Sequence, residues 1–269
     1  MSRFLATMAS RSQERANEAA GRRSLRRRRE AVLAGPAPRP LSGFGASFDL
    51  IAEVKPRSPS EGLFPERSPV ETAMAYQIGG AGMISVLTEP SEFGGSVDML
   101  RDVAAAVSIP VLAKDFLVDP IQVYEAREAG ADGVLVIVRI LDEESLNEIL
   151  DAVSDSRLFA LLEAFDGADL ERISKVVAGL SGHLAGVNCR DLDTLEVVPE
   201  RHVALAGDIP GDVVTVAESA IGQPADVERV ASRGYRAALV GSALMKADDP
   251  ALLVREMVDA GRRSVTVPS

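Results

Sequence analysis

The sequence predicts an α/β fold, a closed (β/α)8 or TIM barrel, with an N-terminal helical extension. From position 49 onward, short β-branched runs alternate with amphipathic segments, which is the pattern of βα units on a parallel sheet. Eight such runs recur at a spacing of roughly 25 to 30 residues, which indicates a closed barrel more than an open doubly wound sheet. The length of 269 residues also suits one barrel of about 250 residues. We therefore place the extension at residues 1–45 and the barrel domain at residues 46–269.

The composition limits the class of protein. With 46% hydrophobic residues the chain can bury a full core, and no apolar run approaches the roughly 18 residues that a membrane span needs. The first residues lack the apolar core of a secretory signal. A net charge of -11 argues against a nucleic-acid-binding protein. The single cysteine, Cys189, excludes an internal disulfide and suits a reducing cytoplasm. We expect a cytoplasmic protein without nucleic-acid or membrane partners.

The extension differs from the rest of the chain. Residues 2–20 are compatible with a helix, residues 22–29 form a basic run, and the proline-rich stretch at 36–40 ends any helix. Four interpretations of the basic run stay open: a phosphate-attracting flap, a nucleic-acid-binding arm, an organellar transit peptide and a solvated helical face.

The strands of the barrel can be placed one by one, because each run is apolar and bounded by turn residues. They are expected at residues 50–55, 83–87, 111–114, 133–137, 159–163, 184–188, 213–218 and 237–240. The helices between them show a 3.6-residue period, and the apolar stripes that begin at Leu146 and Val227 are two examples. Gly79-Gly80 and Gly130 lie where a left-handed helix cap is expected, just before the next strand.

Polar side chains stand at the carboxyl ends of the strands, where the chemistry of such barrels takes place. The first strand ends in Glu53 and Lys55, which share a face because they are two residues apart. Side-chain parity also points Lys114, Glu163 and Glu218 into the barrel, because they share a face with the apolar residues two positions before them. The further polar strand ends are Thr88-Glu89, Lys114-Asp115, Glu163, Asn188 with Arg190, and Glu218. Two lysines and three carboxylates would thus converge on one mouth, which is typical of a functional site.

This set of charges suits proton transfer. A lysine buried beside carboxylates can act as an acid near neutral pH, and a carboxylate beside lysine as a base or electrostatic partner, so two such pairs suit two proton-transfer steps. We expect no metal site, because His183 and His202 lie in connections without ligand spacing and are interpreted as surface residues. Cys189 has no histidine partner in view and is expected to pack as a small residue.

Small-residue turns follow the last two strands. They are Ser-Ala-Ile-Gly at 219–222 and Gly-Ser-Ala at 241–243. Barrels of this kind often hold phosphate on backbone N–H groups at these two strands. The sequence therefore indicates a site for a phosphorylated small molecule.

With these residues laid out, the sequence resembles indole-3-glycerol phosphate synthase, the decarboxylating, ring-closing enzyme of tryptophan biosynthesis. The resemblance covers about residues 45–250 and, more loosely, the extension. The segments that carry it occur in order: IAEVK at 51–55 with SPS at 58–60, LTE at 87–89 with Phe93 and GS at 95–96, PVLAKDF at 110–116, NCRDL at 188–192, ES at 218–219 and GS at 241–242.

The resemblance implies a substrate, 1-(2-carboxyphenylamino)-1-deoxyribulose 5-phosphate. Its carboxylate-bearing ring carbon attacks the ribulose ketone, after which carbon dioxide and then water leave. Lys114 would be the general acid that protonates the ketone oxygen, with Glu163 as its partner. Lys55 would pair with the substrate carboxylate and, together with Glu53, act as acid and base of the dehydration. The division of roles among these four residues stays open.

The resemblance also implies residues that hold the substrate. Asn188 and Arg190 would orient the ribulose hydroxyls and the carboxylate, and Glu218 would support the lysines. The substrate-binding set is completed by Phe93, by Phe116 against the anthranilate ring, and by Ser58, Ser219, Gly241 and Ser242 around the phosphate. In this family the extension covers the barrel mouth. No metal or organic cofactor is implied, and we expect a monomer or a weak homo-oligomer.

Two positions depart from the family pattern. Ala220 stands where the family usually has glycine, and alanine resists a positive φ, so the phosphate loop is expected to be altered. Pro56 stands where a second cation commonly follows the strand-one lysine, and Arg57 is the candidate replacement.

Three alternatives stay open at this point. One is another enzyme on the same barrel, such as phosphoribosylanthranilate isomerase, which needs a base on the first strand opposite an acid across the mouth. Another is a non-catalytic paralogue that binds a phosphorylated metabolite and acts through a partner protein; the matched acids and bases argue against it. The third is a synthase that serves specialised indole metabolism.

Overall fold

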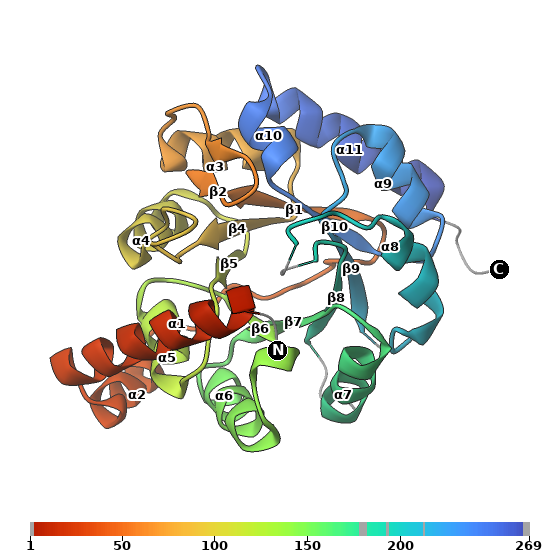
Figure 1. Cartoon of the computed structure of the whole chain (residues 1–269). Coiled ribbons are helices and arrows are strands. Elements are labelled where there is room, and N and C mark those ends of the chain that lie inside the picture. The colour runs from red at the N-terminus through yellow and green to blue at the C-terminus, as the bar shows by residue number, and fades with distance from the viewer. Residues whose placement is uncertain (1–2, 178–181, 192–193, 212, 266–269) are drawn as a thin grey trace.

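The computed structural model describes residues 3–177, 182–191, 194–211 and 213–265. Eight parallel strands close into a barrel in the order β1-β10-β9-β8-β7-β6-β5-β4, with helices around its outside (Figure 1). The sequence-based prediction of a TIM barrel is confirmed. The barrel strands are β1 Asp49–Val54, β4 Met83–Leu87, β5 Val111–Lys114, β6 Gly133–Ile137, β7 Phe159–Ala164, β8 Leu184–Asn188, β9 Val214–Glu218 and β10 Ala237–Val240.

These bounds agree with the expected strands to within one residue at each end. The small shift in β1 leaves Lys55 just beyond the strand, at the start of the connection to β2. The strand register brings the polar ends to one level, because Asn188 pairs with Glu218 and Glu163 pairs with Ile137 across neighbouring strands. The polar strand ends therefore share one edge of the barrel.

Helices follow most strands and cover the sheet. They are α1 Arg3–Arg22, α2 Leu25–Ala34, α3 Pro69–Gly79, α4 Val97–Ala106, α5 Pro120–Glu128, α6 Glu143–Asp155, α7 Gly167–Val177, α8 Glu200–Leu205, α9 Pro224–Ala231, α10 Ser242–Lys246 and α11 Pro250–Ser264, with short 3-10 turns η1 Val138–Ile140 and η2 Ala206–Asp208. The predicted caps are confirmed: Gly80 and Gly130 have φ values of 98° and 96°. Among the described residues, no helix is long and apolar enough to cross a membrane.

The core has two layers, one inside the barrel and one between the sheet and the helices. The outer layer buries the predicted helical stripes, including Leu146 of α6 and Val227 of α9. The inner layer contains Leu112, Leu161 and Val216. Each of these lies two residues before a charged strand end, so the predicted inward direction of the charges is confirmed.

The extension forms a helical hairpin against the barrel. The N-terminal end of α1 lies over the barrel, and its other end lies beside α2 and α5 (Figure 1). Leu5 and Met8 of α1 are buried in the inner cluster together with Phe116. The predicted helix at 2–20 is confirmed over its described residues and continues to Arg22, while residue 2 lies outside the described part.

Three arginines of the basic run, Arg23, Arg28 and Arg29, dock the extension onto the barrel. Arg28 is 7% exposed and pairs with Glu125 and Glu128 of α5. Arg29 pairs with Asp155 at the end of α6 over 2.6 Å. The solvated-face interpretation is therefore wrong for Arg28. Carboxylates of the barrel helices already neutralise these cations.

Candidate active site

A cavity of about 430 Å³ opens at the carboxyl ends of the barrel strands. Every site residue named from the sequence lines it. They are Glu53, Lys55, Ser58, Phe93, Lys114, Phe116, Glu163, Asn188, Arg190, Glu218, Ser219, Gly241 and Ser242. These named residues come from seven of the eight βα units, as expected for a barrel whose strand ends share an edge.

Two lysines and two carboxylates form the charged floor of the cavity. The Lys55 ammonium nitrogen lies 3.0 Å from Oε1 of Glu53. The Lys114 ammonium nitrogen lies 4.0 Å from Oε2 of Glu53 and 4.0 Å from Oε2 of Glu218. Glu53 is 4% and Glu218 1% exposed, so these charges interact with little screening by water.

Glycines make room for these side chains, Gly186 within β8 and Gly241 directly after β10. A Cβ atom at Gly241 would collide with Glu53 and would lie 2.9 Å from the Lys55 ammonium nitrogen. A Cβ atom at Gly186 would collide with Oε1 of Glu218. Any larger residue at either position would displace the charged floor.

The third carboxylate, Glu163, is positioned by a hydrogen bond from the neighbouring strand β8. Asn188 donates a hydrogen bond from its amide to Oε1 of Glu163. The amide oxygen of Asn188 accepts hydrogen bonds from the Ser219 hydroxyl at 2.9 Å and from the Arg190 backbone N–H at 2.8 Å. Asn188 therefore fixes three elements of the mouth relative to one another.

Burial and neighbouring charges shift the pKa values of the residues in this cluster in different directions. Burial alone would lower the pKa of Lys114, but the charges of Glu163, Glu53 and Glu218 outweigh it and raise that pKa. Burial raises the pKa of Glu163, and it raises the pKa of Glu218 further because the Glu163 charge adds to it. For Glu53 the burial effect is outweighed by Lys55 and Lys114, and the pKa is lowered. The cluster thus keeps a charged lysine beside carboxyl groups of unequal acidity, which suits acid–base catalysis.

Aromatic side chains line the opposite side of the cavity. The ring centroids of Phe93 and Phe116 are 6.2 Å apart, and Phe4 of α1 meets Phe116 edge to face at 6.1 Å. Leu135 and Ile137 of β6 complete this wall. It can accept a flat aromatic ring. No sequence pattern indicated Phe4, because this residue belongs to the extension, far from any strand end.

The turns that follow β9 and β10 form the far end of the cavity. Ser219 and Ala220 have φ values of 65° and 58°, so alanine does stand at a position that favours glycine. The Arg190 guanidinium donates to the Ser60 hydroxyl at 3.1 Å and to the Leu195 carbonyl at 3.0 Å. Hydroxyl groups, backbone N–H groups and a cation here suit a phosphate group.

Arg57 does not take the place of the missing cation after Lys55. It is not among the residues that line the cavity. Its guanidinium turns to the β4–α4 connection, where it donates to the backbone carbonyls of Ser91 and Glu92, the latter at 3.0 Å. The proposed replacement is wrong, and Arg57 instead ties β2 (Arg57–Ser58) to the neighbouring loop.

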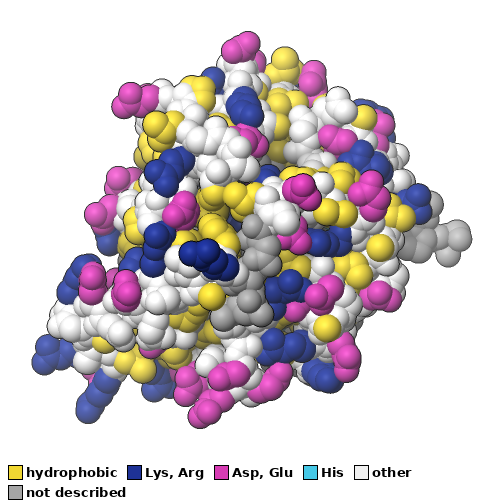
Figure 2. Space-filling view, viewed as in Figure 1, with side chains coloured by type: hydrophobic (Ala, Val, Ile, Leu, Met, Phe, Trp, Pro, Cys, Tyr) yellow, Lys and Arg dark blue, Asp and Glu magenta, His cyan; other side chains and the backbone are white. Residues whose placement is uncertain are grey.

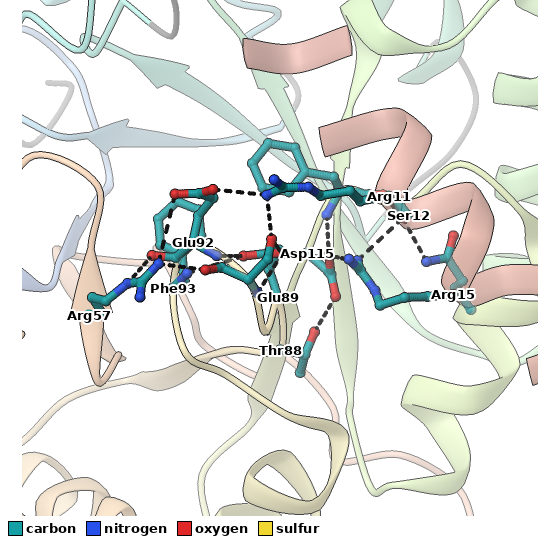
Figure 3. A network of polar contacts seen from close by, with 12 residues as sticks. Arg11, Ser12, Arg15, Arg57, Thr88, Glu89, Glu92, Phe93 and Asp115 are labelled. Atoms are coloured by element: carbon teal, nitrogen blue, oxygen red, sulfur yellow. Dashed lines mark hydrogen bonds and ion pairs between the residues drawn. The ribbon is translucent and has the colours of Figure 1, made fainter. Parts of the chain in front are cut away.

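A polar network that the sequence did not reveal anchors the aromatic wall (Figure 3). The two carboxylate oxygens of Glu89, a fully buried residue, accept hydrogen bonds from the backbone N–H groups of Ser91, Glu92 and Phe93. Arg15 of α1 bridges Glu89 at 3.6 Å and Asp115 at 2.5 Å. The Phe93 loop, the end of β5 and the extension are therefore joined.

Asp115 is the second carboxylate of this network. It accepts a hydrogen bond from the Thr88 hydroxyl at 2.9 Å and from the Phe116 backbone N–H at 2.8 Å. The positions of Glu89 and Asp115 after the second and third strands follow from the sequence, but their partner Arg15 lies 100 positions from Asp115.

Two expectations about other reactive side chains have different outcomes. The surface interpretation is wrong for His202, which is 1% exposed and places its Nε2 3.2 Å from the Glu218 carbonyl oxygen. Burial lowers its pKa to about 4. Cys189 is buried as expected, and burial raises its pKa to about 11. Among the described residues, no group of three His, Cys, Asp or Glu side chains is placed to hold a metal ion.

Structures of known proteins share the fold. The 3-hexulose-6-phosphate synthase from Salmonella typhimurium superposes with a TM-score of 0.63 at 16% identity, covering 81% of this chain and 100% of that one. Thiamine phosphate pyrophosphorylase from Pyrococcus furiosus gives 0.60 at 15% identity, covering 81% and 98%. At such low identity these matches concern the barrel alone.

Comparison of the sequence with those of known proteins identifies the family. The family model for indole-3-glycerol phosphate synthase matches residues 13–257, which includes most of the extension. The indole-3-glycerol phosphate synthase of Nocardioides sp. is 46% identical over 237 residues, 87% of this chain and 90% of the relative. That of Mycobacterium leprae is 43% identical over 235 residues, 86% and 85%. The family model and these relatives show that the chain, whose barrel holds the charged cavity described above, belongs to the indole-3-glycerol phosphate synthase family.

Proposed function

We propose that the protein converts 1-(2-carboxyphenylamino)-1-deoxyribulose 5-phosphate to indoleglycerol phosphate, carbon dioxide and water. The observation that carries this proposal is the position of Lys114, buried among carboxylates between an aromatic wall and two phosphate-type turns. The aromatic ring of the substrate matches one end of the cavity and its phosphate the other. The ribulose ketone then lies between them, near the Lys114 ammonium group.

The first chemical step is ring closure. The carboxylate-bearing ring carbon forms a bond to the ketone carbon, and Lys114 delivers a proton to the ketone oxygen. The raised pKa of Lys114 keeps its ammonium group protonated, so a proton donor is present where negative charge develops on the ketone oxygen. Glu163 is the adjacent group that restores the proton balance of Lys114. Loss of carbon dioxide then returns the bonding electrons to the ring.

The second step removes water. Lys55 holds the substrate carboxylate until carbon dioxide leaves. The Lys55–Glu53 pair, 3.0 Å apart, then provides an acid for the departing hydroxyl and a base for the proton that leaves with it. This allocation follows the charge on each group: the lowered pKa of Glu53 keeps it an anion that can accept a proton.

The remaining site residues bind and orient. Phe93 and Phe116 would enclose the aromatic ring, while Asn188 and Arg190 would orient the ribulose hydroxyls and the carboxylate. Glu218 would support the lysines through Lys114. The phosphate would be held by Ser58, Ser219, Gly241 and Ser242. Residues 1–45 would act as the cover of the mouth, since Phe4 lines the cavity.

The family acts on a phosphorylated small molecule, and we propose that this chain has no nucleic-acid partner. Arg28 and Arg29 of the basic run are already paired with carboxylates of α5 and α6. On the face shown in Figure 2, basic and acidic side chains are interspersed. We also propose a cytoplasmic location and a monomer or weak homo-oligomer.

The synthase is favoured over the alternatives. The matched acids and bases around Lys114 favour an enzyme over a binding protein, because a pure binder has no need of them. The named relatives are synthases and not isomerases. Whether the product serves protein synthesis or specialised indole metabolism depends on neighbouring genes and not on this cavity.

The test is the fluorescence of the indole product after mixing the protein with the carboxyphenylamino-deoxyribulose phosphate. Lys114→Ala is the matched variant, and Lys175→Ala on α7, an exposed lysine, is its control. We expect the wild type and the control to form product and Lys114→Ala to lose a factor of about 100 or more in turnover. Substrate binding by the wild type without product would overturn the proposal.

A further inference from the structure

One lysine in the cavity has no role in the steps above. Lys246 is the last residue of α10, and it lines the same cavity as Gly241 and Ser242. Its ammonium group forms an ion pair with Oε2 of Glu61. Glu61 lies in the turn between β2 and β3 (Gly62–Leu63), so the pair joins the connection after β1 to the element after β10.

A shared aromatic ring places Lys246 on the same side of the cavity as Lys55. The ring centroid of Phe64 is 5.7 Å from the Lys55 ammonium nitrogen and 6.0 Å from that of Lys246. Phe64 is 8% exposed and therefore fixed by packing. Arg67 donates to the Ala247 carbonyl at 2.8 Å, which secures the end of α10. The Lys246 ammonium group therefore lies beside Glu61 and Phe64, near Ser242 in the turn after β10.

The carboxylate of Glu61 is an anion at this end of the cavity. Burial would raise its pKa, but hydrogen bonds from Lys246 and from the Ser242 side chain lower it, so it is ionised. An ammonium and a hydroxyl group are also the donors that phosphate oxygens require. Two anions held by the same donors repel each other. A phosphate that takes these donors has to displace the Glu61 carboxylate.

The position of Glu61 permits that displacement. It lies in the turn of a hairpin of two-residue strands outside the barrel, between Ser58 and the positive-φ residue Gly62. Its side chain can rotate into solvent about three bonds while the barrel strands stay in place. The change affects no hydrogen bond of the barrel.

We propose that Lys246 is a further phosphate-binding residue and that Glu61 is its internal counter-ion, displaced when the phosphate arrives. The pair then selects for a ligand with a dianionic end, because a weaker anion competes poorly with the tethered carboxylate. The identity of the whole ligand rests on the proposed function, whereas the competition itself concerns phosphate alone.

Inorganic phosphate is the probe that tests the competition without turnover. Its dissociation constant is measured by titration calorimetry for the wild type, Lys246→Met, Lys246→Arg and Glu61→Gln. Lys175→Met and Glu171→Gln, from an exposed ion pair on α7, are the matched controls. Circular dichroism checks that each variant is folded.

We expect Lys246→Met to weaken phosphate binding about tenfold and Lys246→Arg to stay within about threefold of the wild type, since a charged hydrogen bond is lost only in the former. Glu61→Gln should tighten binding about threefold to tenfold, because the competing anion is gone. Three results would overturn the proposal. The first is an unchanged dissociation constant in Lys246→Met, and the second is phosphate binding by Glu61→Gln that is no tighter than that of the wild type. The third is no phosphate binding to the wild type or to Glu61→Gln.

Turnover of the carboxyphenylamino-deoxyribulose phosphate separates this inference from the proposed function. Lys246→Met should raise KM about tenfold with kcat within about twofold, because uniform binding is lost. A wild type that turns over while KM of Lys246→Met is unchanged contradicts only the role of Lys246. A wild type that makes no product, with phosphate constants that shift as expected, contradicts only the proposed function.

Discussion

The ammonium nitrogen of Lys114 lies 4.0 Å from Oε2 of Glu218, and the two side chains reach each other from β5 and β9 on opposite sides of the barrel. No nitrogen or hydroxyl group of the described residues hydrogen-bonds to either carboxylate oxygen of Glu218, although its side chain is buried. Burial at this position raises the pKa of the Glu218 carboxyl group. Glu218 contributes to the raised pKa of Lys114, but its ionisation lowers the stability of the fold.

The first prediction concerns the pH dependence of stability in Glu218→Gln. The pKa of Glu218 is raised in the folded state by burial and by Glu163. Its contribution to stability is complete below the unfolded pKa of about 4.3 and is lost as the pH rises through the folded pKa. Glutamine does not ionise and escapes this loss. We expect Glu218→Gln to raise Tm by about 2–4 °C at about pH 8 and by less at about pH 5.

Calorimetric melting of both proteins across this range measures the difference. Glu171→Gln, at an exposed position on α7, is the control and should show no such trend. A Tm difference that shrinks as the pH rises would contradict the assigned direction. Turnover of Glu218→Gln should fall about tenfold or more, since Lys114 loses the carboxyl group that lies 4.0 Å from its ammonium nitrogen.

The second prediction concerns Asn188→Ala. The variant removes the donor to Glu163 and the acceptor for the Ser219 hydroxyl, so a buried carboxyl group and the turn after β9 both lose a hydrogen bond. We expect kcat to fall about 10-fold to 100-fold and KM to rise. Steady-state product fluorescence measures both constants. Asn147→Ala, exposed on α6, should behave as the wild type, and an Asn188→Ala enzyme with wild-type kcat would refute the orienting role.

The third prediction concerns Arg15→Met. This change leaves Asp115 and Glu89 buried without their common cation. We expect a loss of about 1–3 kcal/mol in the free energy of unfolding. Because Glu89 also holds the Phe93 loop, KM should rise about fivefold to tenfold.

Denaturant titration and steady-state kinetics check the two parts. The control is Arg22→Met, whose ion pair with Glu18 is exposed on α1. If Arg15→Met matches Arg22→Met in both measurements, the extension does not act on the aromatic wall through this network. Deletion of residues 1–40 should also weaken substrate binding, but it removes the buried Leu5 and Met8 as well and is less specific.

The fourth prediction concerns Ala220→Gly. With φ at 58°, alanine is strained by about 1 kcal/mol in the turn that we propose to hold the phosphate, and glycine relieves the strain. We expect KM to fall up to about fivefold with turnover within a few-fold. Arg157→Gly relieves a similar φ of 57° far from the cavity and should leave KM unchanged. A large change in turnover of Ala220→Gly with constant KM would contradict the proposal that the turn with Ala220 binds the phosphate.

The residues at the strand ends are the part of the site that local sequence patterns predict. The period-two pattern placed Lys114, Glu163 and Glu218 inside the barrel, and the carboxyl-end rule of parallel barrels placed them in one mouth. Both rules depend on residues that are near each other in the sequence or on the repeat of the βα unit. The structure brings every named site residue to the same cavity for this reason.

The contacts between distant segments follow a different logic. Arg15 meets Asp115, Phe4 meets Phe116, and Lys246 meets Glu61 only after the barrel closes and the extension folds over it. No local period encodes such pairings, because the partner of a charge depends on where the chain returns in space. The burial of His202 against β8 and β9 has the same origin.

The sequence by itself determined the barrel, the positions of its strands to within one residue and the identity of the charged groups at its mouth. Only the tertiary structure decided that Arg57 holds a neighbouring loop, that Arg28 docks the extension and that Glu61 pairs with Lys246. The physical reason is the range of the interactions. Backbone periodicity and turn preferences act over a few residues, whereas ion pairs form between whichever side chains the closed barrel brings together.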